Sequence, residues 1–568
     1  MGTTSDKMKI PASVRTQAAA DLNSLTISEA APLIQSRQIS PVELTQALLC
    51  RVEELDPQIN SFITVTADLA LKQAREAEKE IRAGRYRGPM HGIAFGLKDM
   101  INTAGILTTA CSKILKDNYP EDDATAVKKL YVAGAVLLGK LTTSEFAHGG
   151  TGTGPSFDLL WPPPRNPWNS EYHTGGSSNG PAAAVSAGFV PAALGTDTGG
   201  SIRAPASFCG VVGLKQTYGL VSRTVVITNS FTFDNCGPMT WTVEDCAIVL
   251  QAIAGYDPQD PSSHDVAIPD YRRELTEDLR GVRVGVLRHF WEEDLPINPE
   301  LVEAMEEALD VLKGLGAKIG VARMRPLQEY NDVKIVIAES ELFSVHQRDL
   351  IERAQDYGEI FLGRVLGASL FQAVDYVQAQ RERRKMISEM RPLYEKYDVL
   401  VTAGLGPAPR LDAHRKIGVR QKPNITNPFN ITGGPALAQC IGMSKDGLPF
   451  SMQVASKPFN ETMVFKVAHA YEKATEWRSN RPQLETGTVA NAVAVTRISK
   501  EPRVVDAQTR SLVEQLVTGT GLKLSDDLLI QLCEDAPYVL AMARRIDRNH
   551  SRADEPANVF RFAEHGRD

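Results

Sequence analysis

Apolar residues recur every three to four positions in the first clearly patterned part of the chain, which begins at Ser40. The segment 40–43 combines an N-cap serine, a proline at the first helical position and a capping-box glutamate. Apolar side chains continue at helical spacing as far as Val52. The pattern predicts an amphipathic helix here, followed by a second, strongly charged helix over 67–83.

Short and nearly continuous apolar runs follow this region and alternate with further helical patterns. The run HGIAFGLKDMI at 91–101 is typical of a buried strand. Such alternation of strands with helices predicts an α/β core. Further buried strands are predicted over 135–140, 190–194, 281–287, 398–403 and 450–454, with mostly helical structure over 298–396 and 461–475.

The pattern breaks around 482–502, and the chain beyond it has the character of a small helical unit. One helix is predicted to end at Gly519, a second to begin after the N-cap Ser525, and a third to begin at Pro537. We expect this unit to serve in docking or oligomerisation, with a homodimer as the candidate assembly. The expected domains are an N-terminal extension (1–24), one main domain (25–490) and a helical C-terminal appendage (491–568).

The composition excludes several classes of function. Of the 568 residues, 43% are hydrophobic and 23% charged, which suits a protein with a large core. The net charge of -7 and the lack of a dense Lys/Arg run argue against a nucleic-acid partner. Seven scattered cysteines favour free thiols, and none of the ten histidines has a metal-ligand partner at the usual spacing. With no secretory signal and no membrane span recognisable, a cytoplasmic protein is expected.

The glycine-rich stretch GTDTGGSIRAPASFCGVVGLKQTYG at 195–219 is the strongest candidate for chemistry. Ser201 lies inside its tightest part, between Asp197 and Arg203. The neighbouring glycines relax the limits on φ and let consecutive N–H groups converge on an anion or a polarised carbonyl. A serine in such a turn is placed as a nucleophile beside an oxyanion hole.

Lys98, in the predicted strand over 91–101, is a candidate base for that serine. A lysine has an ordinary pKa near ~10.4 and accepts a proton only when neutral, so burial must lower its pKa to near ~7. The apolar residues before Lys98 favour this burial, and Asp99 is expected on the opposite face of the strand. The alternative, a lysine at the exposed end of a strand, stays open for Lys98 taken by itself.

Three other motifs suggest different chemistry. The GxSxG pattern at 176–180 would make Ser178 the nucleophile of an α/β-hydrolase, but the residues before it, 161–174, are rich in proline and do not form the required strand. The segment 134–141 nearly matches a phosphate-binding loop yet lacks its hydroxyl residue, so a core strand is expected. The glycines at 150–154 open no helix, which disfavours dinucleotide binding.

Four segments together resemble the amidase signature family, serine hydrolases with a Ser-Ser-Lys arrangement. HGIAFGLKDM carries the family's lysine, TGGSSNG its bridging serine, GTDTGGSIRAPASFCGVVGLKQTYG its nucleophile and PFNITGGPALAQCIGMSKDGLPFSMQV a late core segment. The resemblance extends from Leu25 to Pro482. It implies an α/β fold with a large mixed sheet covered by helices on both sides, and neither a metal nor another cofactor.

The same resemblance assigns roles to the candidate residues. It makes Ser201 the nucleophile, Ser177 the bridge and Lys98 the base, and it implies a cis peptide bond between Gly176 and Ser177. The backbone N–H groups implied for the oxyanion hole are those of Thr198, Gly199, Gly200 and Ser201. The residues implied to support the loop are Asp197, Arg203 and Ser178.

The sequence signals for the residues that bind substrate are weaker. The family's pocket segment corresponds to TTSEFAHGGTG at 142–152. No basic side chain in the sequence can be assigned to an anionic substrate, so a neutral amide, an aryl amide or a carbamate is expected rather than the monoamide of a dicarboxylic acid. The candidate lining residues are Phe146, Gly149, Gly150, Thr151, Gly175 and Gly176.

The expected function is that of an amidase, which hydrolyses a linear amide C–N bond of a small molecule through an acyl-enzyme on Ser201. An alternative is the subunit of an amidotransferase that takes ammonia from glutamine and acts with partner subunits. Alternatives from other classes are an α/β-hydrolase-type esterase and a non-catalytic scaffold.

Overall fold

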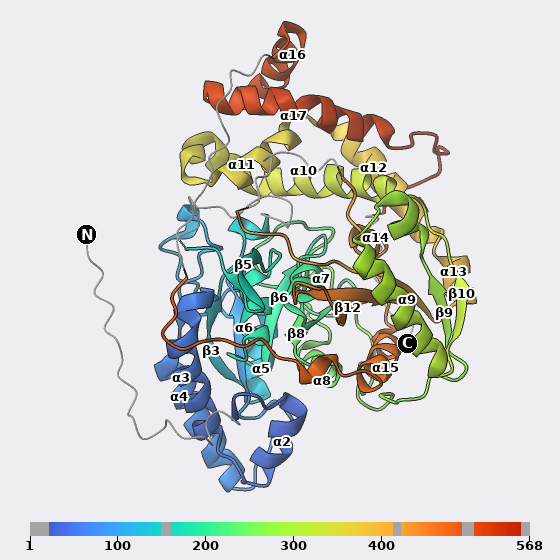
Figure 1. Cartoon of the computed structure of the whole chain (residues 1–568). Helices are drawn as coiled ribbons and strands as arrows, with labels where there is room; N and C mark the ends of the chain where they lie inside the picture. Colours follow the sequence, from blue (N-terminus) through green and yellow to red (C-terminus); the bar gives the residue numbers. More distant parts are fainter. Residues whose placement is uncertain (1–21, 149–160, 413–421, 491–504, 558–568) are drawn as a thin grey trace, which may run out of the picture.

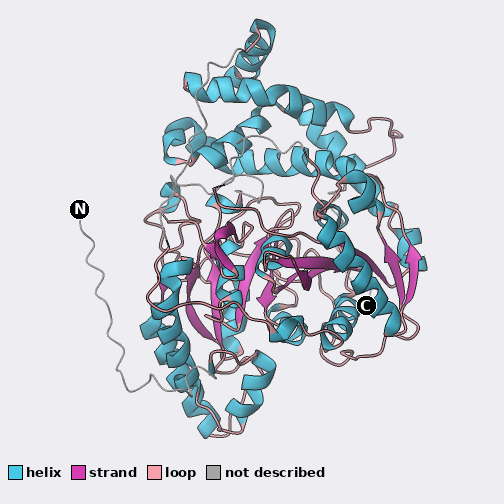
Figure 2. Cartoon of the chain, viewed as in Figure 1, coloured by secondary structure: helices cyan, strands magenta, loops and turns pink. Residues whose placement is uncertain are grey.

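The computed structural model describes residues 22–148, 161–412, 422–490 and 505–557, and a mixed β-sheet forms its centre (Figures 1 and 2). Within these ranges eleven strands make one sheet in the order β1-β3-β2-β6-β8-β7-β12-β13-β11-β9-β10. The expectation of an α/β fold with a large mixed sheet is confirmed. The strands are β1 (Phe62–Val65), β2 (Ala94–Lys98), β3 (Val136–Leu141), β6 (Ala192–Asp197), β7 (Val212–Lys215), β8 (Asn235–Thr240), β9 (Arg283–Val286), β10 (Lys318–Val321), β11 (Val399–Ala403), β12 (Ala436–Met443) and β13 (Pro449–Ala455).

Helices flank the sheet, and α10, α11, α12 and α17 form a further helical layer at the top of the view in Figure 1. Two short strands, β4 (Arg165–Asn166) and β5 (Asn169–His173), pair outside the main sheet. The helices are α2 (Ile27–Gln35), α3 (Pro41–Ile59), α4 (Ala67–Arg82), α5 (Thr125–Val132), α6 (Asn179–Ser186), α7 (Arg203–Cys209), α8 (Val243–Ile253), α9 (Pro299–Gly314), α10 (Leu327–Arg353), α11 (Glu359–Val365), α12 (Ala373–Ser388), α13 (Arg391–Lys396), α14 (Asn427–Thr432), α15 (Glu461–Lys473), α16 (Ala507–Thr518) and α17 (Asp526–Arg545).

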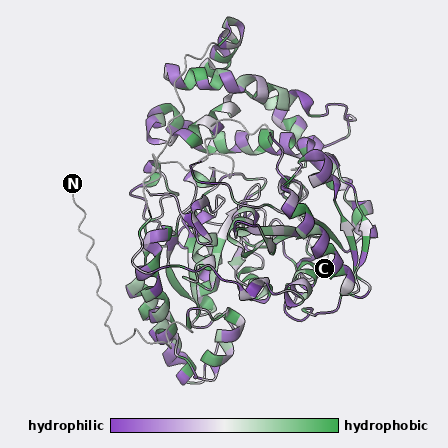
Figure 3. Cartoon of the chain, viewed as in Figure 1, coloured by the Kyte–Doolittle hydropathy of each residue, from purple (hydrophilic) through white to green (hydrophobic). Residues whose placement is uncertain are grey.

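The strands β2, β3 and β6 are buried along their whole length. Because β2 runs parallel to both neighbours and both of its faces are covered, its sequence is a continuous apolar run rather than an alternating one. Figure 3 shows the hydrophilic residues mostly on the outer helices. The segment 134–141 contains β3, a core strand as predicted, and forms no phosphate-binding loop.

The parallel pairing of β2 and β6 also determines where the candidate catalytic residues lie. Lys98 is the last residue of β2, and Asp197 is the last residue of β6, its parallel neighbour. The carboxyl ends of parallel strands meet at one edge of a sheet. The predicted base and the glycine-rich loop after Asp197 therefore emerge side by side.

Local helix signals in the sequence are mostly confirmed. Ser40 caps α3 by accepting a hydrogen bond from the Val42 N–H, and Glu43 completes the capping box. The prediction of a new helix at Pro537 is wrong, because α17 continues through this proline. The buried side chains of α17 extend from Leu532 to Ala543, and this packing holds the helix together despite the missing N–H donor.

The C-terminal unit, defined here as residues 505–557, packs against the main domain. Figure 1 shows α17 (red) lying across α10 and α11 (yellow), and in Figure 3 it carries both hydrophobic and hydrophilic stretches. Apolar side chains of α16 and α17 share one hydrophobic cluster with α10, α11 and the segment around Phe146, separate from the large core of the sheet. The unit is thus part of the main body's packing.

Three further observations concern the predictions from composition. All seven cysteines are free thiols. In the described parts of the chain, no group of three or more His, Cys, Asp or Glu side chains is arranged to hold a metal ion. Of the helices described, none by itself has the length and apolarity to cross a bilayer; the segments Glu359–Leu370 and Ala373–Lys396 meet that criterion only as a pair bent by 96°.

Candidate active site

The amine of Lys98 is buried among hydroxyl groups. Lys98 Nζ lies 2.7 Å from Ser177 Oγ and 2.7 Å from Thr196 Oγ1. Neither Lys98 nor Ser177 has any exposed surface, so the alternative of an exposed strand end is wrong for this lysine. Among the described residues, no carboxylate forms an ion pair with Lys98.

Burial lowers the pKa of Lys98 to about 7, and the charges of Asp197 and Asp234 offset only part of this effect. Asp99, the adjacent acid, points away from Lys98 as predicted. Its carboxylate lies 3.3 Å from Lys140 Nζ and accepts hydrogen bonds from the Thr109 N–H and hydroxyl. A substantial fraction of Lys98 is therefore neutral at neutral pH.

Two hydrogen bonds to the Ser177 carbonyl group fix the turn that carries this serine. The Gly176–Ser177 peptide bond is cis, as the resemblance implied. The Ser177 carbonyl accepts hydrogen bonds from Thr143 Oγ1 at 3.1 Å and from the Ser144 N–H at 3.2 Å. These contacts hold the Ser177 hydroxyl toward Lys98.

Ser178 links the two serine turns. Its N–H donates to the Ser201 carbonyl at 3.0 Å, and its Oγ donates to the Thr196 carbonyl at 3.1 Å. The Thr196 N–H in turn donates to Ser178 Oγ at 3.2 Å. With its hydroxyl engaged on the backbone, Ser178 is a structural residue here, and this arrangement disfavours an esterase in which Ser178 is the nucleophile.

Asp197 and Arg203 form a buried ion pair that shapes the glycine-rich loop. The Asp197 carboxylate accepts hydrogen bonds from the N–H groups of Gly200 at 2.8 Å and Ile202 at 3.1 Å. Arg203 donates to both carboxylate oxygens, each at 3.1 Å. Burial by itself raises the pKa of Asp197, but Arg203 and the hydrogen bonds outweigh burial and hold that pKa well below its usual range.

Three of the four expected oxyanion donors have no partner in the loop. Among the described residues, the N–H groups of Thr198, Gly199 and Ser201 donate to no protein atom. The Gly200 N–H differs, because it already donates to Asp197. The Gly199 carbonyl points away from the loop's interior, toward Thr426 Oγ1 at 2.7 Å. The loop thus presents N–H groups beside Ser201.

Ser201 lines a cavity together with its own loop. Of the residues predicted to line it, Gly176 does so, whereas Gly149, Gly150 and Thr151 lie outside the described residues. Phe146 packs behind the wall, with its ring centroid 4.3 Å from that of His346. Gly175 lies against Pro205 instead. The described lining residues are Ala147, His148, Gly176, Thr198, Gly199, Gly200, Ser201, Ala204, Asn229, Lys334, Arg364 and Asn424.

Two basic residues in this lining were not identified from the sequence. Lys334 belongs to α10 and Arg364 to α11, and both are buried. Lys334 reaches the loop itself, since a Cβ at Gly199 would lie 3.0 Å from its Cε. The sequence offered no basic side chain that could be assigned to an anionic substrate, whereas two such side chains line this cavity. No local motif marks either residue, because each reaches the site only through the packing of a distant helix.

One carboxylate partly balances these cations. Glu339 lies 3.3 Å from the Arg364 guanidinium and 2.7 Å from His148 Nε2. Burial, reinforced by the charge of Arg364, lowers the pKa of His148 to about 3, so His148 is neutral at pH 7. Burial opposes ionisation of Glu339, but a hydrogen bond from His148 and the positive charge of Arg364 outweigh burial and lower its pKa. Among the described residues, the lining thus contains two cations, Lys334 and Arg364, and the Glu339 carboxylate lies beside Arg364.

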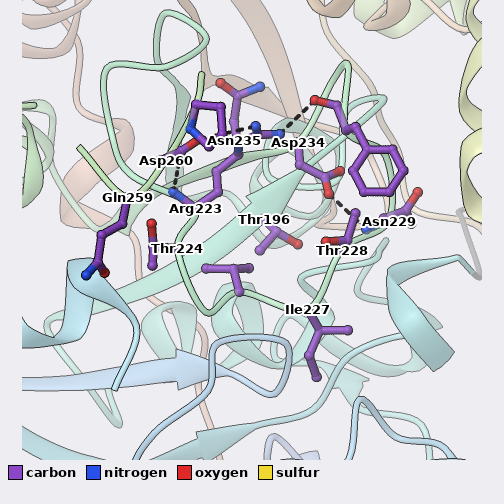
Figure 4. Close-up of a pocket in the computed structure, with 13 residues that line it drawn as sticks. Thr196, Arg223, Thr224, Ile227, Thr228, Asn229, Asp234, Asn235, Gln259 and Asp260 are labelled. Carbon is purple, nitrogen blue, oxygen red and sulfur yellow. Dashed lines mark hydrogen bonds and ion pairs between the residues drawn. The ribbon is translucent and has the colours of Figure 1, made fainter. Parts of the chain in front are cut away.

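A second cavity lies on the other side of the strand end and is shown in Figure 4. Thr196, the hydroxyl partner of Lys98, lines it, and Asn229 lines both cavities. Asp234 accepts hydrogen bonds from Thr198 Oγ1 at 2.5 Å and from the Asn229 N–H at 2.8 Å. Asp234, which lines the second cavity, is thus hydrogen-bonded to Thr198, which lines the first.

Replacement of Gly200 by alanine should abolish activity. Gly200 has a φ of +109°, and an added Cβ would overlap Thr426 Oγ1 and lie 2.8 Å from Thr426 Cβ. We expect kcat/KM of Gly200→Ala to fall by ~10²-fold or more because the oxyanion donors are displaced. Gly105→Ala is the matched control, with a φ of +69° and open space around the added Cβ. Wild-type activity in Gly200→Ala would contradict this geometry.

The comparisons with known proteins agree with this geometry. The family model described as Amidase matches residues 43–465. A glutamyl-tRNA(Gln) amidotransferase subunit of Geobacter metallireducens is 38% identical over 494 residues, covering 81% of this chain and 99% of that protein.

Solved structures give the same result. The native peptide amidase of Stenotrophomonas maltophilia has a TM-score of 0.71 and 31% identity, covering 80% of this chain and 98% of its own. The corresponding glutamyl-tRNA(Gln) amidotransferase subunit of Thermotoga maritima has a TM-score of 0.67 and 34% identity, covering 80% of this chain and 95% of its own. The chain belongs to the amidase signature family of enzymes that hydrolyse C–N bonds.

Proposed function

We propose that this chain hydrolyses a carboxamide through an acyl-enzyme on Ser201, with Ser177 as proton relay and Lys98 as base. The observation that carries the proposal is the buried amine of Lys98, 2.7 Å from Ser177 Oγ and without a carboxylate partner among the described residues. A serine hydroxyl becomes an effective nucleophile only when a base accepts its proton. A neutral lysine supplies that base without histidine.

In the first step Ser201 Oγ attacks the amide carbonyl carbon. Its proton passes to Ser177 Oγ, whose own proton passes to Lys98 Nζ. The negative charge that develops on the carbonyl oxygen is stabilised by the N–H groups of Thr198, Gly199 and Ser201. When the C–N bond breaks, the relay returns a proton to the departing nitrogen. Ammonia or an amine leaves, and the acyl group stays bonded to Ser201.

In the second step water attacks the acyl-enzyme. The relay through Ser177 removes a proton from this water, and a carboxylic acid leaves as Ser201 recovers its hydrogen. The same N–H groups stabilise the second oxyanion. Because Asp197 holds the loop through Gly200 and Ile202, the donors are oriented before substrate binds and need no reorganisation during the reaction.

The charge of the cavity wall supports an acyl group that carries one carboxylate. Lys334 and Arg364 line the cavity beside Ser201, and Glu339 lies 3.3 Å from Arg364. The described lining contains no carboxylate that could bind an ammonium group. We therefore propose a monoamide of a small dicarboxylic acid as substrate, in place of the neutral or aryl amide expected from the sequence.

Glutamine, used by an amidotransferase complex, is the second candidate. Its support is the 38% identity to the amidotransferase subunit of Geobacter metallireducens over almost the whole length of that protein. Glutamine has the carboxamide and the carboxylate that this wall would accept. Its α-ammonium group, however, would meet two cations and no carboxylate among the described lining residues. The charges of the lining favour an acid amide without an amino group, whereas the sequence identity to the amidotransferase subunit favours glutamine.

The pH dependence of hydrolysis tests the base. Only neutral Lys98 accepts a proton, so kcat/KM should rise with pH through about 7 and then level off. Lys98→Arg keeps the charge but does not lose its proton, and we expect its kcat/KM to be at least ~10³-fold lower. Lys215 is the matched control because burial lowers its pKa to about 7 as well. If Lys215→Met loses the ionisation near 7 while Lys98→Arg retains normal rates, the assignment of Lys98 is wrong.

Ammonia release from a panel of amides tests the substrate class. We expect glutaramate and succinamate to be hydrolysed by the purified chain, with glutamine and neutral amides much slower. Lys334→Met should lower kcat/KM for glutaramate by ~10- to 10²-fold, the scale of one lost hydrogen bond to a charged group, and leave neutral amides unchanged. Lys313→Met, an exposed lysine of α9, is the control.

The same panel separates the two candidates. Efficient hydrolysis of glutamine, but not of glutaramate, would favour the amidotransferase function. Dependence of this activity on added partner subunits would support it further. No hydrolysis of any amide, or full activity in Ser201→Ala, would overturn the proposed function.

A further inference from the structure

The peptide unit between Gly199 and Gly200 lies at the centre of the glycine-rich loop. Its N–H, that of Gly200, donates to Asp197 at 2.8 Å, and its carbonyl group, that of Gly199, points the opposite way. The peptide units on either side carry the N–H groups of Gly199 and Ser201, two of the proposed oxyanion donors. The orientation of the central unit therefore determines how both donors are aimed.

Two flanking glycines make this peptide unit easy to rotate. Glycine adopts φ values that other residues avoid, and Gly200 has a φ of +109°. A rotated unit would turn the Gly199 carbonyl oxygen toward the cavity, where it would repel a substrate oxyanion. A side chain at either position would meet a neighbour, because a Cβ at Gly199 would lie 3.0 Å from Lys334 Cε and a Cβ at Gly200 would overlap Thr426. The unit must therefore be held by residues outside the loop.

Thr426 holds the carbonyl end of this unit. Its Oγ1 donates to the Gly199 carbonyl at 2.7 Å, and Asn424 Nδ2 donates to the same oxygen at 3.1 Å. Asn424 Oδ1 is a second acceptor near the Thr426 hydroxyl, at 2.9 Å, but it already accepts the Thr426 N–H at 3.1 Å. The Gly199 carbonyl is thus the nearer acceptor for the Thr426 hydroxyl.

The position of Thr426 is itself fixed by the ion pair of the loop. Thr426 is 1% exposed, and its carbonyl group accepts a hydrogen bond from Arg203 at 2.9 Å. It is the N-cap residue of α14, where a threonine is favoured as a side-chain cap, yet its hydroxyl makes no cap hydrogen bond. On the same helix Asn430 donates to Asp197 at 2.8 Å. Asp197, Arg203 and α14 thus hold both ends of the peptide unit.

We propose that Thr426 is a positioning residue for the oxyanion hole: its hydroxyl keeps the Gly199 carbonyl turned away from the cavity and so keeps the N–H groups of Gly199 and Ser201 directed into it. This role rests on the function proposed above. Thr426 touches no reacting atom. Its contribution should therefore appear only where charge develops on the substrate oxygen, in the transition state and in adducts that resemble it.

The kinetics of glutaramate hydrolysis by the full-length chain test this role. Thr426→Val replaces the hydroxyl by a methyl group of similar size. We expect kcat to fall by about 10-fold, the scale of one lost hydrogen bond, with KM within about 2-fold of wild type. Thr426→Ser keeps the hydroxyl and should retain most of the wild-type kcat. Thr45→Val is the matched control, because Thr45 is fully buried on α3 and its hydroxyl has no hydrogen-bond partner among the described residues.

Inhibition by two ligands separates the oxyanion hole from substrate binding. Glutaric semialdehyde has the acyl chain of glutaramate, with an aldehyde in place of the carboxamide. The Ser201 O–H adds across its C=O bond and gives a hemiacetal, whose oxygen lies where the oxyanion would be. Glutarate, the product, forms no such adduct. We expect Thr426→Val to raise the Ki of the semialdehyde by about 10-fold and to leave that of glutarate within about 2-fold of wild type.

The pH dependence separates this role from an effect on the base. The Thr426 hydroxyl is engaged on the Gly199 carbonyl rather than on the relay. The rise of kcat/KM that follows from the pKa of Lys98, about 7, should therefore keep its midpoint in Thr426→Val.

Four results would overturn the proposal: wild-type kcat in Thr426→Val, an equal loss of affinity for the semialdehyde and for glutarate, a shifted pH midpoint, or no recovery in Thr426→Ser. An equal loss of affinity would mean that the whole cavity is disturbed. Failure of the proposed function is a separate result, seen when the wild-type chain neither hydrolyses an amide nor binds the semialdehyde, and the positioning role would then fail with it.

Discussion

The candidate active site depends on one constraint: the amine of Lys98 is buried and, among the described residues, has no carboxylate partner. Water would stabilise the charged ammonium, and an adjacent acid would do the same, so a neutral lysine requires that both be kept away. Water is excluded because β2 lies between β3 and β6 and is buried along its whole length. The acids around Lys98 are engaged elsewhere: Asp99 by Lys140 and Thr109, Asp197 by Arg203, and Asp234 by Thr198. What remains near Nζ are the hydroxyls of Ser177 and Thr196, groups through which a proton can move.

The buried acids farther from Ser201 are also paired. No carboxylate forms an ion pair with Lys98 in the described parts of the chain, and two basic residues, Lys334 and Arg364, line the cavity. Three buried acids each have a basic partner: Asp197 has Arg203, Glu339 has Arg364, and Asp332 has Arg545. Because unpaired buried charges are costly, these pairs also hold the loop, α10 and α17 in their relative positions. The glycine-rich loop and the helices of the cavity wall are thus each held by buried ion pairs.

The sequence predicted the residues that we propose act on the bond and missed two basic residues that line the cavity beside them. Lys98, Ser177 and Ser201 lie in short segments whose glycines and apolar flanks are visible locally, and the strand pattern of β2 predicted the burial of Lys98. Lys334 and Arg364 lie on helices more than 120 residues beyond Ser201, and no local motif marks them. The Gly200 N–H was expected as an oxyanion donor, but it donates to Asp197 instead. This hydrogen bond depends on the folded geometry of the loop and is not visible in the sequence. Pro537 was misplaced as a helix start because a proline in a helix interior is tolerated only where packing compensates, and packing is not visible in a local pattern.

Identifying the acylated residue tests whether Ser201 is the nucleophile and Lys98 its base. The measurement is peptide mass spectrometry after reaction of the full-length chain with a slowly hydrolysed ester of the preferred acid, followed over time at several pH values. We expect an acyl group on the peptide that carries Ser201, formed faster as pH rises through about 7 and not formed in Lys98→Met. An acyl group on Ser178 instead, or the same rate of acylation with and without Lys98, would contradict it.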